Sequence, residues 1–242
     1  MLFRSVSRLH GIDLEEGAVE LAAFSLCLSL CDALEPEDIR ASVKLFPRLD
    51  GETLHWSCFF KAKSEGLMKV PIAAIVGNPP FESSLTTDGA KQSYDAYAKG
   101  HGSLADKQLA YLFVHDAMEM LQPGGILAMV EPAGFLYNQN TLSFRRSFFE
   151  RWSVRELLDF VSVRGMFKKG KADPKVVVVI AEARKPTPES QLLHAVFRRS
   201  GRAAAEQGFD IDYYDLYWVR NAEAERSRDV WRANLLGGSR FK

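Results

Sequence analysis

The residues best suited to chemistry form one short stretch, Asn78-Pro79-Pro80-Phe81. Each proline has a fixed φ angle and no N–H donor, and the residue before a proline is held in extended backbone. The stretch is therefore a stiff loop that presents a side-chain amide, two fixed carbonyl groups and an aromatic ring. Such groups can hold a ligand through hydrogen bonds and ring contact.

The loop follows an apolar run, residues 72–76, in which Ile75 and Val76 are β-branched. Such a run predicts a buried strand. The strand is expected to end at Gly77, because the Asn-Pro-Pro sequence after it cannot continue a hydrogen-bonded ladder. Ligands of open α/β sheets bind at the carboxyl ends of the strands. The loop is thus predicted to lie where such a sheet binds its ligands.

A second feature is Asp13, which follows Gly11-Ile12 and precedes an apolar helical segment. A carboxylate between a strand and a helix can accept hydrogen bonds from both hydroxyls of a ribose. Aspartate is also a good helix N-cap. From these residues alone, the N-cap is the simpler interpretation.

Further strands and helices alternate along the chain, as in a doubly wound α/β sheet. Helical spacing covers residues 17–34, 104–121 and 143–152, and strands are expected at 43–46, 72–76, 126–130, 154–161 and 176–180. Helix 17–34 is apolar on nearly every face, which predicts that it is covered on all sides. Residues 82–103 are predicted to form a long polar loop. The predicted fold class is therefore α/β.

The chain changes character after residue 185. Pro186 and Pro188 are typical of a linker, and residues 209–219 are aromatic and acidic without a clear period. We therefore expect a catalytic core over residues 1–185 and an extension over residues 186–242.

Charge is distributed unevenly along a chain that is neutral overall, with 31 basic and 31 acidic residues among 242. Residues 1–144 carry 11 basic and 18 acidic residues (11 − 18 = −7), and residues 145–202 carry 14 and 6 (14 − 6 = +8). The basic segment suits an anion such as nucleic acid, and it equally suits an ordinary solvated surface.

The three cysteines form no metal-ligand pattern, and we expect no metal site. Cys27 and Cys31 lie four residues apart on an apolar helix, which predicts buried, reduced thiols. No apolar run is long enough to span a bilayer, and the N-terminus lacks the features of a signal peptide. We expect a cytoplasmic protein.

Taken together, the motifs resemble those of S-adenosylmethionine-dependent DNA methyltransferases that modify the N6 amino group of adenine, as in restriction-modification and related phage-defence systems. The segment 75–81 is similar to the family's catalytic motif, and Gly11-Ile12-Asp13 is similar to its acidic ribose motif. Later segments match in order: 121–136 (a helix end and strand), Phe167 with 175–181 (a late aromatic motif) and 231–238 (a segment that leads toward target recognition). An Asn-Pro-Pro-Phe motif on a strand, with the other motifs in order, is a specific match.

This resemblance implies a Rossmann-like methyltransferase sheet, S-adenosylmethionine as cofactor, double-stranded DNA as substrate, and other parts of a restriction-modification complex as partners. The Asn78 side-chain oxygen and the Pro79 carbonyl would accept hydrogen bonds from the N6 amino group of an adenine flipped out of the duplex. Pro80 suits this motif because its backbone is locked beforehand. Phe81 would stack on the flipped base.

The resemblance also implies roles outside the catalytic motif. Ile12 and Asp13 would bind the cofactor, and Glu52 would contact its adenine. Phe167 would pack on the other side of the flipped base. Phosphate contacts would come from Lys168, Lys169 and Lys171. Plainer interpretations are also possible for these residues. Phe167 is then a loop aromatic that packs on the sheet, and the three lysines belong to a solvated basic loop.

The chain departs from the family pattern in its N-terminal part. In the family, a glycine-rich loop that cradles the methionine part of the cofactor precedes the acidic motif, whereas only ten residues, none of them glycine, precede Gly11 here. Ala73 stands where aspartate is common, and Glu52 where aspartate or asparagine is usual. The resemblance therefore predicts a sheet that is incomplete at its N-terminal side. It also predicts weak cofactor binding and little methylation by this chain alone.

Two alternative functions are also consistent with the sequence. Methyltransferases that act on RNA or on protein glutamine share Asn-Pro-Pro, most often followed by tyrosine, whereas Phe81 and the long polar segment favour DNA. The second alternative is a non-catalytic fragment of a restriction-modification protein that binds DNA or a partner. The incomplete cofactor cradle motivates this second reading.

Overall fold

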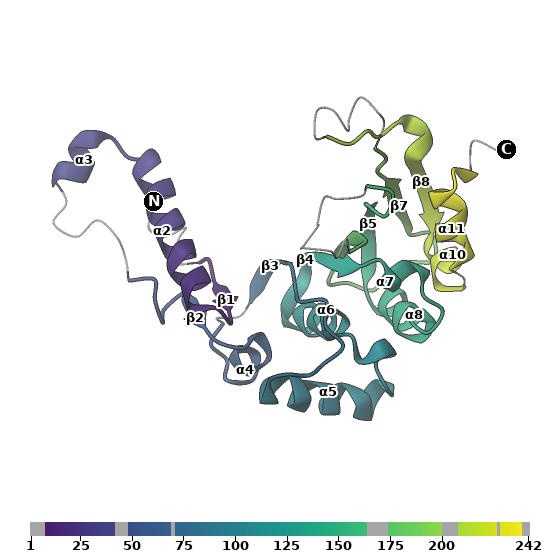
Figure 1. The fold of residues 1–242 in the computed structure, drawn as a ribbon, viewed down its shortest axis with the longest axis horizontal. Helices are drawn as coiled ribbons and strands as arrows, with labels where there is room; N and C mark the ends of the chain where they lie inside the picture. The colour runs from purple at the N-terminus through teal and green to yellow at the C-terminus, as the bar shows by residue number, and fades with distance from the viewer. Residues whose placement is uncertain are drawn as a thin grey trace. The chain divides into compact units, whose positions relative to one another are not determined.

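A computed structural model describes residues 8–41, 48–68, 71–163, 174–199, 208–226 and 228–238 (Figure 1). The chain forms two compact units. The smaller unit comprises Met1–Lys69 and Thr86–Ser93, and the larger comprises Val70–Leu85 and Tyr94–Lys242.

The smaller unit is built on a two-stranded parallel sheet. Strand β1 (Gly11–Asp13) pairs with β2 (Leu54–Trp56), with Gly11 opposite Leu54 and Asp13 opposite Trp56. A Cβ atom on Gly11 would lie 2.7 Å from Leu54 Cδ2, so the close approach of the strands requires glycine there. The helices of this unit are α2 (Glu16–Asp32), α3 (Pro36–Ala41) and α4 (Phe59–Ser64).

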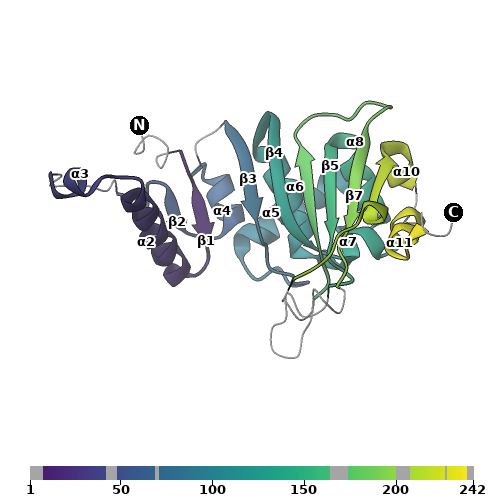
Figure 2. The same ribbon diagram turned by 90° about the horizontal axis from the view of Figure 1, so that it is seen from above.

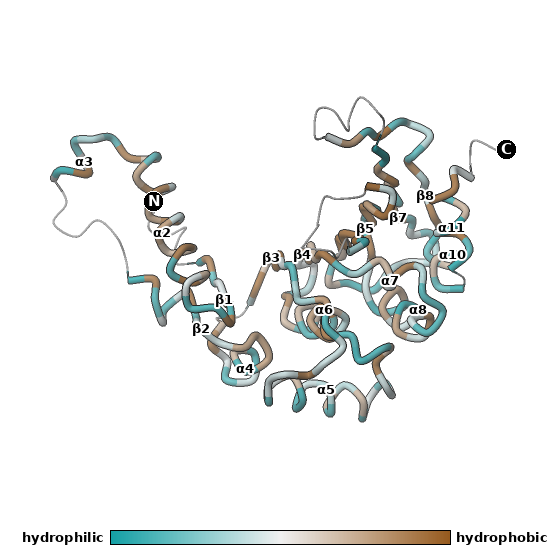
Figure 3. The backbone as a smooth tube through the Cα atoms, viewed as in Figure 1, coloured by the Kyte–Doolittle hydropathy of each residue, from teal (hydrophilic) through white to brown (hydrophobic). Residues whose placement is uncertain are grey.

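Helix α2 confirms the helix expected at 17–34, but its packing differs from the expectation. Val19 and Leu30 are buried against Leu49 and Leu54. The opposite face remains exposed within the unit: Leu21 is 64%, Phe24 59% and Leu28 50% exposed. Figure 3 shows hydrophobic residues along α2. The prediction of full burial was wrong for this unit, because composition predicts that a helix is apolar but not what covers it.

The larger unit contains a six-stranded sheet with the order β3-β4-β6-β5-β7-β8 (Figure 2). Its strands are β3 (Ile72–Gly77), β4 (Leu121–Pro132), β5 (Ser153–Asp159), β6 (Val176–Glu182), β7 (Gln191–Val196) and β8 (Leu216–Arg220). The α/β fold class is confirmed, and so are strands at the expected positions 72–76, 126–130, 154–161 and 176–180. Strand β3 is not buried as predicted, because it is the end strand of this sheet in the described residues: Val76 is 80% exposed. The strand expected at 43–46 lies outside the described residues.

The sheet is mixed. Pairs β3/β4 and β5/β7 are parallel, but β6 runs antiparallel to both β4 and β5, and β8 is antiparallel to β7. Strand β6 is a run of four valines and an isoleucine. Such a fully buried strand has the same pattern in either direction, so its direction could not be predicted from hydropathy.

The helices of the larger unit lie beside the strands in a simple pattern. Helix α6 packs on β4, α8 on β5, α10 on α8 and β8, and α11 on β7 and α7. Their bounds are α6 (Leu109–Met120), α7 (Gly134–Tyr137), α8 (Leu142–Arg151), α10 (Asn221–Arg226) and α11 (Asp229–Leu235), with 3₁₀ turns at Ala105–Lys107 and Tyr213–Asp215.

The polar segment 82–103 is not a long loop. It contains helix α5 (Asp88–His101), which begins in the smaller unit and continues into the larger one. Ala90 and Tyr97 of this helix are buried, and many of its other residues are polar. Two serines and two threonines before it and glycines within it concealed its helical period, because those residues are typical of loops.

The segment after residue 186 continues the sheet of the larger unit, since β7 pairs with β5 and β8 with β7. A buried polar network joins these elements. Asp159 of β5 lies 3.2 Å from His194 Nε2 of β7, and His194 Nδ1 lies 3.2 Å from the Asn234 amide of α11. The domain boundary proposed at 185/186 therefore does not coincide with a break in the sheet. No helix in the described residues is both long and apolar enough to cross a membrane.

Candidate functional site

The Asn-Pro-Pro-Phe loop begins where β3 ends, at Gly77, which lies opposite Met129 of the parallel strand β4. The Asn78 side chain is exposed, and its amide has no hydrogen-bond partner among the described residues. The Pro79 ring is buried, which anchors the loop beside the sheet. The loop thus presents a free amide next to a fixed backbone, at the ligand-binding end of a parallel strand pair.

Phe81 lies half-buried on one cluster of the core. It packs against Phe160, Val163 and Val176, which are all buried. Phe160 in turn stacks on Phe197 with ring centroids 4.5 Å apart. One part of the Phe81 surface is thus held by the core and the rest is accessible, so a structural role and a stacking role are compatible.

Sequence reasoning missed a buried carboxyl group near the carboxyl end of β4. Glu131 is fully buried, and both of its carboxyl oxygens lack hydrogen-bond partners among the described residues. Burial raises the pKa of Glu131 well above its usual value. Burial also raises the pKa of the neighbouring Tyr111 on α6. The only sequence signal was a single acid inside an apolar strand.

In the smaller unit, Asp13 lies at the carboxyl end of β1 and is exposed. One carboxylate oxygen accepts a hydrogen bond from the Glu15 backbone N–H at 2.9 Å. The residue therefore supports the turn before α2, which is close to the plainer N-cap interpretation. Its second oxygen has no hydrogen bond among the described residues, so a ribose hydroxyl could still be accommodated. Ile12 lies within β1 and is half-buried.

Trp56 is a further candidate that sequence reasoning missed. It pairs directly with Asp13 across the parallel strands, and 60% of its side chain is exposed. Its indole N–H donates to the Leu14 carbonyl at 2.8 Å, which fixes the ring. An exposed, oriented aromatic ring beside an exposed carboxylate is a suitable surface for a nucleoside. The residues around it lacked a clear period, so nothing marked the carboxyl end of a strand.

The structure does not bring Glu52 to this surface. Glu52 lies in the turn before β2, where its N–H donates to the Leu49 carbonyl at 3.2 Å. Because β1 and β2 are parallel, the start of β2 lies at the opposite edge of the sheet from Asp13. Trp56, not Glu52, therefore neighbours Asp13, and the adenine contact expected of Glu52 stays a prediction.

The remaining predicted residues cannot be placed. Phe167, Lys168, Lys169 and Lys171 lie outside the described residues, so their assigned contacts with base and phosphate stay predictions.

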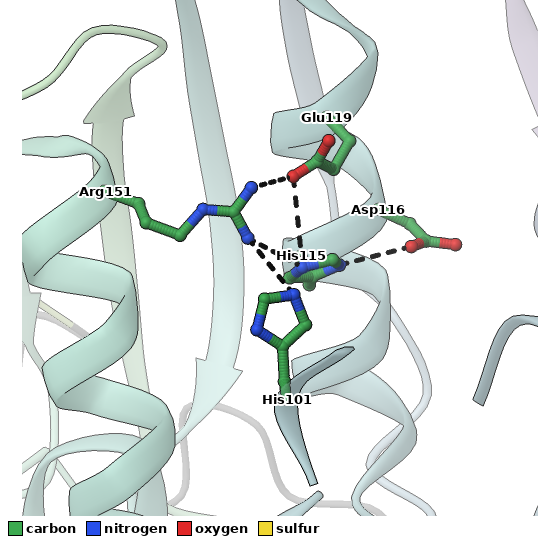
Figure 4. A network of polar contacts seen from close by, with 5 residues as sticks. All are labelled: His101, His115, Asp116, Glu119 and Arg151. Carbon is green, nitrogen blue, oxygen red and sulfur yellow. Dashed lines mark hydrogen bonds and ion pairs between the residues drawn. The ribbon is translucent and has the colours of Figure 1, made fainter. Parts of the chain in front are cut away.

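A second polar cluster joins three helices of the larger unit (Figure 4). Arg151 of α8 lies 3.2 Å from His115 Nε2 of α6, pairs with Glu119 of α6, and lies 3.5 Å from His101 Nε2 at the end of α5. Burial lowers the pKa of His101, and the charges of His115 and Arg151 lower it further, against the opposing effect of Glu119. In the described part of the chain, no group of three histidine, cysteine or acidic side chains is arranged to hold a metal.

Comparison of the fold with solved structures finds distant relatives. The M protein of the type I restriction enzyme EcoKI is 16% identical, with a TM-score of 0.50 over 78% of this chain and 35% of that one. The type ISP restriction-modification enzyme LlaBIII bound to DNA is 12% identical, with a TM-score of 0.56 over 79% and 15%. A chain of a type I restriction-modification system is 14% identical, with a TM-score of 0.52 over 99% and 61%. At these identities the likeness establishes the fold alone.

The chain therefore spans less than two thirds of the length of each of these structures. No curated protein sequence matches it. A family model described as "Eco57I restriction-modification methylase" matches residues 7–167, which include β1, β2, the Asn-Pro-Pro-Phe loop and strands β3 to β5. On this match over most of its length, the chain belongs to the Eco57I restriction-modification methylase family.

Proposed function

We propose that this chain carries the catalytic part of a DNA methyltransferase, which transfers a methyl group from S-adenosylmethionine to the N6 amino group of adenine. One observation carries the proposal. In a chain of this methylase family, the Asn78 amide is exposed beside the proline-locked backbone at the carboxyl end of β3, and it has no hydrogen-bond partner among the described residues.

The chemistry that these groups offer is positioning and charge stabilisation. The N6 lone pair of adenine is delocalised into the ring, so the amine is a poor nucleophile. The Asn78 side-chain oxygen and the Pro79 carbonyl each accept one N6 hydrogen and draw the amine toward tetrahedral geometry. The positive charge that grows on nitrogen then meets two fixed acceptors. Because Pro79 is buried, the acceptors are held before the base arrives.

Phe81 supplies the stacking surface for the base. The base must leave the duplex to reach Asn78, which costs a few kcal/mol of unstacking. Stacking on an aromatic side chain returns about 1–3 kcal/mol per base. The packing of Phe81 on the cluster of Phe160 and Val176 holds its ring in place for this contact.

The smaller unit supplies groups suited to the cofactor. When bound, S-adenosylmethionine supplies an electrophilic methyl group on a sulfonium. The unbonded oxygen of Asp13 is suited to accept from a ribose hydroxyl, and Ile12 lies beside it in β1. The exposed ring of Trp56 is suited to stack on the cofactor adenine.

Double-stranded DNA is the proposed substrate, within a restriction-modification complex. The family to which the chain belongs is named for restriction-modification, and the LlaBIII enzyme, which has a similar fold, is described as bound to DNA. The basic segment 145–202, with 14 basic and 6 acidic residues, supports an anionic substrate.

The test measures transfer of a labelled methyl group from S-adenosylmethionine to DNA, RNA or protein. The variant Asn78→Ala is compared with Asn140→Ala, which also replaces an exposed asparagine of the larger unit. We expect DNA labelling to fall by roughly 10²–10³-fold in Asn78→Ala, the range for losing one fixed transition-state contact. Its thermal unfolding should not change, because the Asn78 side chain is exposed and makes no hydrogen bond with the part of the chain that the structure describes.

The control variant should retain the wild-type rate within about twofold, as expected for an exposed side chain away from the reacting atoms. Labelling of protein alone, or equal activity of Asn78→Ala and wild type, would contradict the proposal. DNA that is labelled at cytosine rather than adenine would contradict the assigned target atom.

A further inference from the structure

Asp159 is the last residue of β5, and its carboxylate is fully buried in the larger unit. Its two oxygens hold different parts of the chain. Oδ2 accepts from the Tyr137 hydroxyl of α7 and lies 3.2 Å from Nε2 of His194 on β7. Oδ1 accepts from the backbone N–H of Val161 at 2.8 Å. One oxygen therefore joins separate elements, whereas the other holds the segment that directly follows β5.

The Oδ1 contact shapes the turn over residues 160–163. An aspartate that accepts from the N–H two residues later forms an Asx-turn, which fixes the direction in which the chain leaves the strand. The Val163 N–H donates to the Phe160 carbonyl at 2.9 Å and closes the turn. The Phe160 N–H donates to the Val176 carbonyl at 3.2 Å, which ties the turn to the first residue of β6. The turn thus depends on backbone contacts together with one side chain, that of Asp159.

This turn supplies part of the surface on which Phe81 packs. Phe160 and Val163 are buried, and together with Val176 they form the cluster against which the half-buried Phe81 ring lies. Two of these three residues belong to the turn, and the third accepts its N–H bond. Because side chains in a protein interior are closely packed, a change in the turn would displace the surface that holds Phe81.

A stacked pair of aromatic rings extends the same arrangement toward β7. The Phe160 and Phe197 rings are stacked, with centroids 4.5 Å apart and an angle of 7° between their planes. The Phe197 N–H donates to the backbone carbonyl of Asp159 at 2.8 Å. Asp159 therefore restrains both rings, Phe160 through the turn that its side chain holds and Phe197 through its backbone.

The chemistry of a carboxylate suits this position. A buried carboxylate is costly to remove from water unless its oxygens accept hydrogen bonds. Its two oxygens offer several lone pairs, so Asp159 can serve donors that arrive from three segments of the chain at once. A hydroxyl at the same position has a single oxygen and would serve fewer of these donors.

We infer that Asp159 is a positioning residue for Phe81: its Oδ1 sets the turn 160–163, and the turn holds the Phe81 ring where the target base stacks. The contacts of Oδ2 stabilise the unit, whereas the contact of Oδ1 controls the ring. The consequence for methyl transfer rests on the proposed function, but the control of the Phe81 ring by Asp159 does not.

Substitutions can separate the two oxygens. Asp159→Ala and Asp159→Ser both lose the contacts with Tyr137 and His194. The serine hydroxyl can still accept from the Val161 N–H, because serine forms the equivalent turn, though more weakly. The matched control is Tyr137→Phe, which removes a contact of Oδ2 and leaves Oδ1 unchanged.

The first experiment observes the Phe81 ring directly, without DNA or methyl donor. The 242-residue chain carries para-fluorophenylalanine in place of Phe81, and its fluorine NMR line is recorded under conditions in which each variant is folded. We expect the wild-type line in Tyr137→Phe and Asp159→Ser, and a shifted or broadened line in Asp159→Ala. A wild-type line in Asp159→Ala would overturn the inference. A shifted line in both Tyr137→Phe and Asp159→Ser would also overturn it, because Oδ2 would then control the ring.

The second experiment measures labelled methyl transfer to DNA by the same variants without the fluorine label, at a temperature at which circular dichroism shows them folded. We expect kcat/KM to be roughly tenfold lower in Asp159→Ala than in Asp159→Ser, the lower range for a lost stacking contact. A purely structural role predicts equal activity of these two folded variants, and that result would contradict the positioning role.

A further variant keeps the test decisive if Asp159→Ala does not fold. Asp159→Asn and Asp159→Ser both offer an oxygen to the Val161 N–H, so both should retain the wild-type fluorine line. Loss of that line in folded Asp159→Asn would overturn the inference. If the wild-type chain labels no DNA, the proposed function fails, and the fluorine spectra still decide whether Asp159 positions Phe81.

Discussion

The two units of the chain stabilise themselves in different ways. The larger unit buries whole strands and a connected polar network, in which Asp159 accepts from Tyr137, His194 and the backbone N–H of Val161. The smaller unit has two strands of three residues each and a helix, α2, with one apolar face exposed. The comparison teaches that similar hydrophobic content supports very different amounts of burial, depending on how much sheet a helix can cover.

The largest effect is expected from a substitution that breaks the buried polar network of the larger unit. Replacing Asp159 by Ala leaves the Tyr137 hydroxyl and His194 without their buried acceptor. We expect the free energy of unfolding to fall by about 3–5 kcal/mol, as for other buried pairs that lose one partner. Hydrogen exchange read by peptide should show faster exchange in β5 and β7 but unchanged exchange in α2. Faster exchange throughout both units would contradict the separation drawn above.

The next effect depends on pH and concerns Glu131 of the larger unit. Its folded-state pKa is raised by burial, so its contribution to stability is complete below the unfolded pKa of about 4.3 and is lost as pH rises toward the folded value. Replacing Glu131 by Gln should therefore stabilise the protein relative to wild type, increasingly as pH rises, by up to ~1.4 kcal/mol per pH unit in that window.

Denaturant unfolding of Glu131→Gln and wild type between pH 5 and 8 measures this difference. The control is Glu189→Gln, which changes an exposed carboxyl group. A difference between wild type and Glu131→Gln that does not vary with pH would show that Glu131 is not held neutral.

A smaller effect compares two exposed tryptophans, one in each unit. Trp56 of the smaller unit is 60% exposed and fixed by Leu14, whereas Trp218 of the larger unit is 68% exposed on the edge strand β8. If the proposed cofactor surface is correct, Trp56→Ala should weaken S-adenosylmethionine binding by roughly tenfold, the lower range for a lost stacking contact. Trp218→Ala should leave cofactor binding unchanged in the same calorimetric titration. Equal losses in both variants would remove Trp56 from the proposed site.

The smallest effect concerns the exposed face of α2. Leu28→Ser replaces an apolar side chain that is half exposed, so we expect the free energy of unfolding to change by no more than about 0.5 kcal/mol. The buried neighbour Leu30→Ala on the same helix should cost about 2–5 kcal/mol. Thermal unfolding of the two variants would test this contrast. A large loss in Leu28→Ser would mean that its face is covered in solution.

Sequence reasoning predicted the parts of the molecule that depend on local pattern. Residue types and short-range backbone restraints were enough to predict the strands before Gly77 and around Val178. They also predicted the stiff loop at Asn78. The features it missed are made by pairing across the chain. Trp56 became a candidate only because β2 pairs in parallel with β1, and the same register moved Glu52 away from Asp13.

The buried polar network and the burial of Arg145 could not be predicted from the sequence, for the same reason. Asp159 and Asn234 meet through His194 although they are far apart in the sequence, and each has an ordinary local context. Arginine is rarely buried, so the sequence alone does not mark Arg145 as a core residue. Its burial depends on the loop before α8, whose Phe135 carbonyl and Thr141 hydroxyl receive its Nη1 group.

The position of β6 has a consequence for how the larger unit is made. Strand β6 lies between β4 and β5, although both precede it in the chain. The strands β4 and β5 are therefore joined only through their hydrogen bonds with β6. Its four consecutive valines have little power to select their own alignment. Glu182 at its end pairs with Arg155 of the neighbouring strand β5, a cross-strand contact made in the observed alignment. During synthesis on the ribosome, the centre of the sheet can therefore close only after residue 182 has emerged.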